Sequence, residues 1–178
     1  MKDWNLLLTS QMAQERRLLR EVAGLGEFSP SDFREVIIGK VPDPEAFLET
    51  LKTWWEEKPF LPQLLSTAVP VRLVFPFTLE NLVARLKEEL LPLMAEIGDQ
   101  AFYVRMKRRG HKGEVSSLEV EQALDQFLKE ELAARGFSPR IDFADPEVIV
   151  LVETVHNQCG LALITRQMKE RYPFIKVK

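Results

Sequence analysis

The chain has 178 residues, 46% of them apolar, and carries 24 basic against 27 acidic side chains, a formal net charge of -3. This length and apolar content allow one large or two small domains with a buried core, and they exclude disorder along most of the chain. A mildly acidic protein is a poor general binder of nucleic acid, so such binding would need a local concentration of cations.

Targeting, redox and metal signals are few. No run of twenty apolar residues occurs, and the N-terminus lacks the pattern of a signal peptide, so we expect a cytoplasmic protein that makes no membrane contact. The single cysteine, Cys159, cannot form an internal disulfide and is expected to be a small buried residue at the start of a strand. With one cysteine and two histidines, neither a zinc site nor another cofactor is expected.

The first half of the chain alternates strand and helix patterns. Three apolar strand patterns and two amphipathic helix patterns follow one another at residues 4–10, 12–23, 34–41, 43–58 and 68–77. Asp43 and Pro44 are typical of a helix start. Since a further short strand fits near residues 26–33, the order predicts a ferredoxin-like βαββαβ sandwich at residues 1–76. Trp54 and Trp55 lie on a helical apolar stripe and are expected to be core residues.

The second half, residues 77–178, predicts an α/β domain. Thr78 is a good helix N-cap, and Pro92 divides the following pattern into two linked helices. Ser116 and Glu119 form a capping box for a long helix that ends at Gly136. Later segments predict a strand buried on both faces, a short hairpin, an antiparallel strand and a basic, partly ordered tail, at residues 145–155, 156–160, 161–165 and 166–178.

The strand pattern between the two groups of helices alternates with period two. Phe102, Val104 and Met106 are expected to face the core. The opposite face then carries one aromatic and three cationic side chains, namely Tyr103, Arg105, Lys107 and Arg109. One face of this strand is therefore predicted to be cationic.

Cations concentrate at this strand and the loop that follows it. No acidic residue occurs between Asp99 and Glu114. We call the positively charged and histidine side chains of this stretch the basic cluster: Arg105, Lys107, Arg108, Arg109, His111 and Lys112. Residues 98–178 have 13 basic against 12 acidic side chains, whereas the preceding 97 have 11 against 15, so the charge differs between the two halves.

Two interpretations of the basic cluster stay open on composition. Exposed lysine and arginine can form a solvated sheet surface that protects an edge against aggregation. The arrangement favours the other interpretation, in which the cations neutralise RNA phosphates while Tyr103 stacks on a base. Arg108 shares the side of the core residues and projects only if the strand ends there.

Signatures of enzymes are missing from the sequence. It contains no phosphate-binding glycine loop, dinucleotide fingerprint, metal-binding histidine pair or nucleophile elbow. His111 and His156 fall in predicted loops, where a solvated histidine without a catalytic partner is expected. Catalysis within these residues is therefore not expected.

Four segments resemble the THUMP domain, an RNA-binding module of tRNA-modifying systems. They are FYVRMKRRGHK, SSLEVEQALDQFL, IDFADPEVIVLVETV and CGLALIT, in the order and spacing of the family within roughly residues 70 to 166. The first half is similar to the ferredoxin-like domain that commonly precedes this module. The whole arrangement resembles the stand-alone adaptors that assist an acetyltransferase in making N4-acetylcytidine in tRNA.

The resemblance implies a function and its partners. It implies a non-catalytic protein that holds the acceptor stem and 3′ end of tRNA with the basic cluster and presents the tRNA to a separate acetyltransferase or methyltransferase. The alternative is a protein-interaction subunit of an RNA-modifying complex with little RNA affinity of its own.

Overall fold

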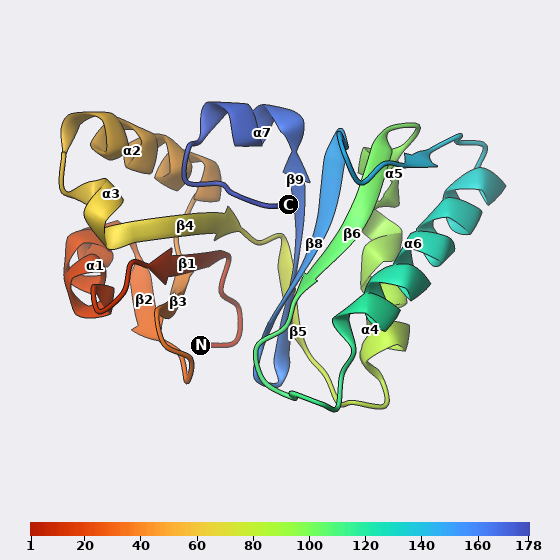
Figure 1. The fold of residues 1–178 in the computed structure, drawn as a ribbon, viewed down its shortest axis with the longest axis horizontal. Helices are drawn as coiled ribbons and strands as arrows, with labels where there is room; N and C mark the ends of the chain where they lie inside the picture. The colour runs from red at the N-terminus through yellow and green to blue at the C-terminus, as the bar shows by residue number, and fades with distance from the viewer. The chain divides into compact units, whose positions relative to one another are not determined.

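A four-stranded antiparallel sheet forms the centre of the first part of the chain. In the computed structural model, which describes residues 1–178, its strands follow the order β2-β3-β1-β4 (Figure 1). The elements are β1 Leu6–Ser10, α1 Glu15–Val22, η1 Ala23–Leu25, β2 Glu27–Pro30, β3 Val36–Lys40, α2 Pro44–Glu57, α3 Leu61–Leu64 and β4 Leu65–Pro70. This βαββαβ order confirms the predicted ferredoxin-like sandwich, with α3 as a short addition.

The start of α2 follows the local signals of the sequence. The Asp43 carboxylate accepts hydrogen bonds from the Glu45 and Ala46 N–H groups at 3.0 and 3.3 Å, and Pro44 occupies the first helical position. Phe47, Leu48 and Leu51 are buried on the inner face of the helix. The tryptophans that follow, Trp54 and Trp55, are only half-buried, so their prediction as core residues holds in part.

The C-terminal segment completes the first unit, contrary to the sequence-based division. The chain divides into Met1–Phe75 with Gln167–Lys178, and Pro76–Arg166, whereas the sequence placed the tail with the second domain and expected partial order. After α7 (Arg166–Arg171), the Phe174 carbonyl accepts a hydrogen bond from Ala68 N–H at 3.0 Å. Four apolar side chains of the tail are buried, namely Tyr172, Phe174, Ile175 and Val177. Their burial explains why this segment is ordered.

A salt bridge and a hydrogen bond to Glu49 fasten the tail to α2. The Arg171 guanidinium contacts both Glu49 carboxylate oxygens, at 2.6 and 2.8 Å, and the Tyr172 hydroxyl donates to one of them at 2.7 Å. Hydrogen bonding by Arg171, then by Tyr172, lowers the pKa of Glu49 to about 2. The Trp55 ring lies 5.8 Å from the Phe174 ring. These contacts are formed by basic and aromatic residues of a tail that looks solvated in sequence.

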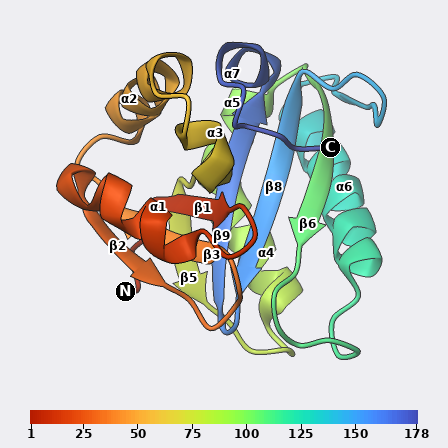
Figure 2. The ribbon, with the colours of Figure 1, turned by 60° about the vertical axis from the view of Figure 1, so that its left-hand side comes forward.

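A five-stranded mixed sheet in the order β5-β9-β8-β6-β7 forms the centre of the second part of the chain. Its elements are β5 Leu73–Pro76, α4 Leu82–Leu90, η2 Leu91–Leu93, α5 Met94–Ile97, β6 Ala101–Lys107, α6 Ser117–Ala134, β7 Arg140–Ile141, β8 Val148–Val155 and β9 Gln158–Thr165. Helices α4 and α6 contact each other, and α6 packs against β6 (Figure 1, Figure 2). Together with the first unit, this confirms the predicted α+β fold.

One of the two predicted helix starts in the second unit is confirmed. Ser116 caps α6 by accepting from Glu119 N–H at 3.2 Å. Thr78 instead exchanges side-chain to backbone hydrogen bonds of 2.8 and 3.3 Å with Asn81, which is the N-cap residue of α4. Strand β8 is buried along its whole length and pairs antiparallel with β9. Cys159 is buried at the second position of β9, and burial raises the pKa of its thiol strongly. No helix combines the length and the hydropathy that a membrane span requires.

Candidate nucleic-acid interface

Strand β6 has an open edge that α6 covers with carboxylates. Strand β7 pairs only with Ala101 and Phe102, so the outward N–H groups further along β6 have no strand partner. Val104 N–H donates to Asp125 Oδ1 at 2.9 Å, and Met106 N–H donates to Glu121 Oε2 at 2.8 Å. Glu121 and Asp125 are four residues apart, which is a rise of about 6 Å along a helix, and Val104 and Met106 are two residues apart, which is about 6.6 Å along a strand. The spacing of the two carboxylates therefore matches the spacing of alternate N–H groups on the strand.

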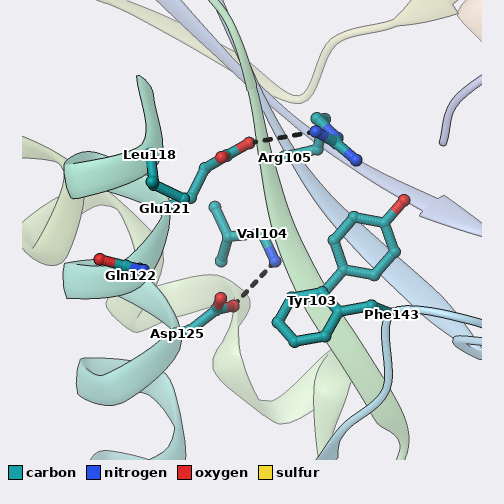
Figure 3. A pocket seen from close by; sticks show the side chains of 8 residues that line it. All are labelled: Tyr103, Val104, Arg105, Leu118, Glu121, Gln122, Asp125 and Phe143. Atoms are coloured by element: carbon teal, nitrogen blue, oxygen red, sulfur yellow. Dashed lines mark hydrogen bonds and ion pairs between the residues drawn. The ribbon is translucent and has the colours of Figure 1, made fainter. Parts of the chain in front are cut away.

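A pocket of about 220 Å³ opens beside this edge (Figure 3). It is lined by Tyr103, Val104, Arg105, Leu118, Glu121, Gln122, Asp125 and Phe143. Burial raises the pKa of the Asp125 carboxyl to about 6; the Val104 N–H bond partly offsets this effect, and the Glu121 charge adds to it. The open side of the pocket is bordered by two exposed apolar residues, Leu118 and Phe143.

Asp125→Asn is expected to stabilise the protein at neutral pH. The folded pKa of about 6 lies above the usual value near 3.9, so the contribution of Asp125 is fully present below about pH 4 and is lost as the pH rises through about 6. Asparagine keeps the acceptor oxygen without the buried charge. Because water reaches the pocket and screens the charge, we expect a gain of only about 1 kcal/mol at pH 7 and none at pH 4.

Urea unfolding at both pH values measures this difference. Glu130→Gln, on the exposed side of the same helix, is the matched control and should change stability equally little at both values. A gain for Asp125→Asn that is the same at pH 4 and pH 7 would show that the charge of Asp125 is not its cause.

Tyr103 is not available as a stacking platform in this structure. Its side chain is only 3% exposed, because the Phe143 ring lies 5.6 Å from its ring and the Arg105 guanidinium carbon lies 5.6 Å away over it. The predicted base-stacking role is therefore corrected. Phe143, which is 70% exposed at the rim of the pocket, is the aromatic ring that solvent reaches. Its position in a loop of mixed composition gave no sequence signal.

Arg109 is held by the fold rather than presented to solvent. Its guanidinium forms an ion pair with Glu153, whose side chain is 1% exposed, and is itself 16% exposed. Its backbone N–H donates to Thr154 Oγ1 at 2.9 Å, and its carbonyl accepts from His156 N–H at 3.0 Å. Its prediction as an RNA contact is corrected, because a phosphate would have to compete with a buried carboxylate.

The other cations of the basic cluster are more accessible. Arg105 is 43% exposed and lies 3.8 Å from the Glu121 carboxylate. Lys107 ends β6, and Arg108, just beyond the strand, donates a hydrogen bond to the Gly110 carbonyl. Lys112 is exposed in the loop. These four cations, which we call the accessible cations, come from the end of one strand and the loop that continues it.

The two histidines form a pair rather than two separate solvated groups. The His111 and His156 rings are stacked with their centroids 5.8 Å apart and an interplanar angle of 8°. His111 Nε2 lies 2.8 Å from Asn157 Oδ1, and the Phe77 ring packs against His111 at 5.7 Å. The loop after β6 and the β8–β9 turn thus meet at this point, which the separation of the histidines in sequence did not reveal. No group of three or more potential metal ligands is present in the structure.

Most of the second unit matches the model of a described family. Residues 80–163 match the model of the THUMP domain, which confirms the resemblance of the four sequence segments. No curated protein sequence matches the chain.

Solved structures share the fold of both units at low sequence identity. TrmN from Thermus thermophilus has a TM-score of 0.62 at 20% identity, with 90% of this chain and 45% of that chain covered. PH1313 from Pyrococcus horikoshii Ot3 has a TM-score of 0.60 at 13% identity, covering 89% and 53%. A 4-thiouridine synthetase in complex with RNA and ATP has a TM-score of 0.58 at 11% identity, covering 90% and 41%. The chain thus spans about half the length of these proteins.

These neighbours contradict the prediction that the protein is not an enzyme. The same fold occurs in a 4-thiouridine synthetase, where it accounts for less than half of the chain. A lack of catalytic motifs in residues with this fold is therefore compatible with catalytic activity of a protein that contains it.

Proposed function

Because residues 80–163 form a THUMP domain, we propose that the chain binds tRNA through the accessible cations and presents it to a tRNA-modifying active site. The observation that carries the proposal is the gathering of Arg105, Lys107, Arg108 and Lys112 at one strand end, with no acidic residue between Asp99 and Glu114. Such a local excess of cations binds phosphates even where the whole chain is acidic.

The finer proposal concerns the part of the tRNA and the modification. We propose that the acceptor stem and 3′ end are bound, and that the modifying activity is that of an acetyltransferase or methyltransferase, in first place a cytidine N4-acetyltransferase. The family resemblance supports this choice. Measuring N4-acetylcytidine in tRNA from cells with the gene deleted and then restored tests it, and an unchanged level in the deletion would exclude acetylation.

A salt titration of tRNA binding tests the basic proposal. If four phosphates are neutralised, log K should fall against log salt with a slope of about -3 to -3.6. The double variant Lys107→Ala with Lys112→Ala should lower this slope to about half, since each lost phosphate contact removes nearly one unit. Lys129→Ala, which removes an exposed lysine of α6, is the matched control and should leave the slope unchanged.

Two results would contradict this proposal. One is binding of tRNA with no salt dependence, and the other is equal affinity for tRNA and an unrelated RNA hairpin. Failure of the purified protein to bind tRNA at low salt would instead favour the alternative of a protein-interaction subunit.

A further inference from the structure

His111 and His156 both occupy a backbone region that side chains other than glycine rarely adopt. Their φ angles are 55° each, and the neighbouring Gly110 and Gly113 in the same loop have φ angles of 95° and 80°. A residue other than glycine in this region costs on the order of 1 kcal/mol. Glycine would occupy both positions with less strain. The presence of histidine at both therefore indicates a role for the imidazole side chains.

The geometry of the pair favours an anion over a metal ion. The rings are parallel, so their nitrogen lone pairs point outward from the stack rather than toward one shared point, and no third ligand is present. With Asn157 Oδ1 as acceptor, His111 Nε2 carries its proton and Nδ1 is left to take up a second one. A protonated pair presents N–H donors and positive charge along one side.

The charges around the pair are mostly cationic. The loop that contains His111 contributes the cations Arg108 and Lys112 and one exposed acid, Glu114. Arg109 in the same loop is neutralised by Glu153 of β8. The β8–β9 hairpin has no ionisable acidic or basic side chain from Thr154 to Thr165 apart from His156 and the buried Cys159 thiol. In the segment that follows Phe77, the first acidic residue is Glu80. Two imidazolium rings beside these cations would repel one another without an anion between them.

We propose that His111 and His156, with Lys112, form a phosphate site for an RNA phosphodiester that binds more tightly as the imidazoles take up protons. The proposal rests on the proposed tRNA binding and adds to it a second element, the β8–β9 turn, and a dependence on pH. A phosphate accepts hydrogen bonds from the N–H groups that protonation adds to the two rings, and it neutralises the charge of Lys112. It is therefore the anion that the protonated pair requires. Affinity for tRNA should therefore rise as the pH falls.

Binding of tRNA at pH 6.0 and pH 8.0 and constant ionic strength tests this site. The tRNA should carry a 5′ hydroxyl, because a terminal phosphate titrates in the same range. Wild-type protein should bind about five- to tenfold more tightly at pH 6.0, a change in log K of about 0.7 to 1 that corresponds to an average uptake of about a third to half a proton over these two pH units. The variant His111→Gly with His156→Gly should lose most of this ratio while keeping or raising Tm, because glycine relieves the backbone strain.

Controls separate this inference from the function on which it rests. Lys112→Ala should weaken binding at both pH values and keep the ratio, since a lysine stays charged throughout. An unchanged ratio in the double glycine variant would overturn the inference and leave tRNA binding intact. Absence of tRNA binding by the wild-type protein at both values would instead contradict the proposed function.

Nuclear magnetic resonance gives a second measurement. The chain has two histidines, so the two imidazole C–H signals can be followed without interference from others. Adding dimethyl phosphate as a diester probe should shift the titration midpoints of both rings upward. Midpoints that do not respond to the probe would overturn the phosphate site.

Discussion

Replacing Arg109 with alanine is expected to lower the free energy of unfolding of the second unit by about 3–5 kcal/mol, because it leaves the buried Glu153 carboxylate without its partner. For a unit of this size the loss corresponds to a fall in Tm of about 12 °C or more. Scanning calorimetry measures it directly. Tryptophan fluorescence is unsuitable, since the three tryptophans Trp4, Trp54 and Trp55 all lie in the first unit.

The matched controls separate a buried ion pair from a lost surface charge. Arg105→Ala, which removes a guanidinium that is 43% exposed, should cost less than about 1 kcal/mol. The double variant Arg109→Met with Glu153→Met should be close to wild type, because well-packed apolar groups of similar volume often replace a buried pair without loss. If Arg109→Ala kept its Tm and lost RNA affinity, Arg109 would be a contact residue after all.

Phe174→Ala is expected to destabilise the first unit by about 3–5 kcal/mol, as the loss of a fully buried phenylalanine does in other cores. Its ring contacts Trp55, so tryptophan fluorescence reports this unfolding well. Lys176→Ala, two residues further on and exposed, is the control and should stay within about 0.5 kcal/mol of wild type. A tail that is only loosely attached would give the same small effect for both variants.

Local signals in the sequence predicted most of the fold. Asp43 and Ser116 cap helices through contacts between residues two or three positions apart, which a sequence pattern can reveal, whereas the predicted cap Thr78 lies one turn before the start of α4. The apolar run of β8 is also a local pattern, and it predicted a strand that is buried on both faces. The tail was misassigned because its partner, Glu49, lies 122 positions away.

The interface was predictable as a region but not residue by residue. The alternation of β6 placed Arg105 and Lys107 on one side, yet it could not show that Glu153 pairs with Arg109 or that Phe143 covers Tyr103. Both partners lie on other elements, as does His156 opposite His111. Long-range pairing decides which cations and rings stay accessible, and a single sequence contains no direct signal for it.

The two-piece first unit also has a consequence for the order in which the chain can fold. Its last segment is synthesised after residues 76–166, so the second unit can complete its fold while the first still lacks part of its core. An unfolded second unit would turn that stretch into a long loop, whose closure costs on the order of 4 kcal/mol in chain entropy. Damage to the second unit is therefore transmitted to the first through the covalent chain alone.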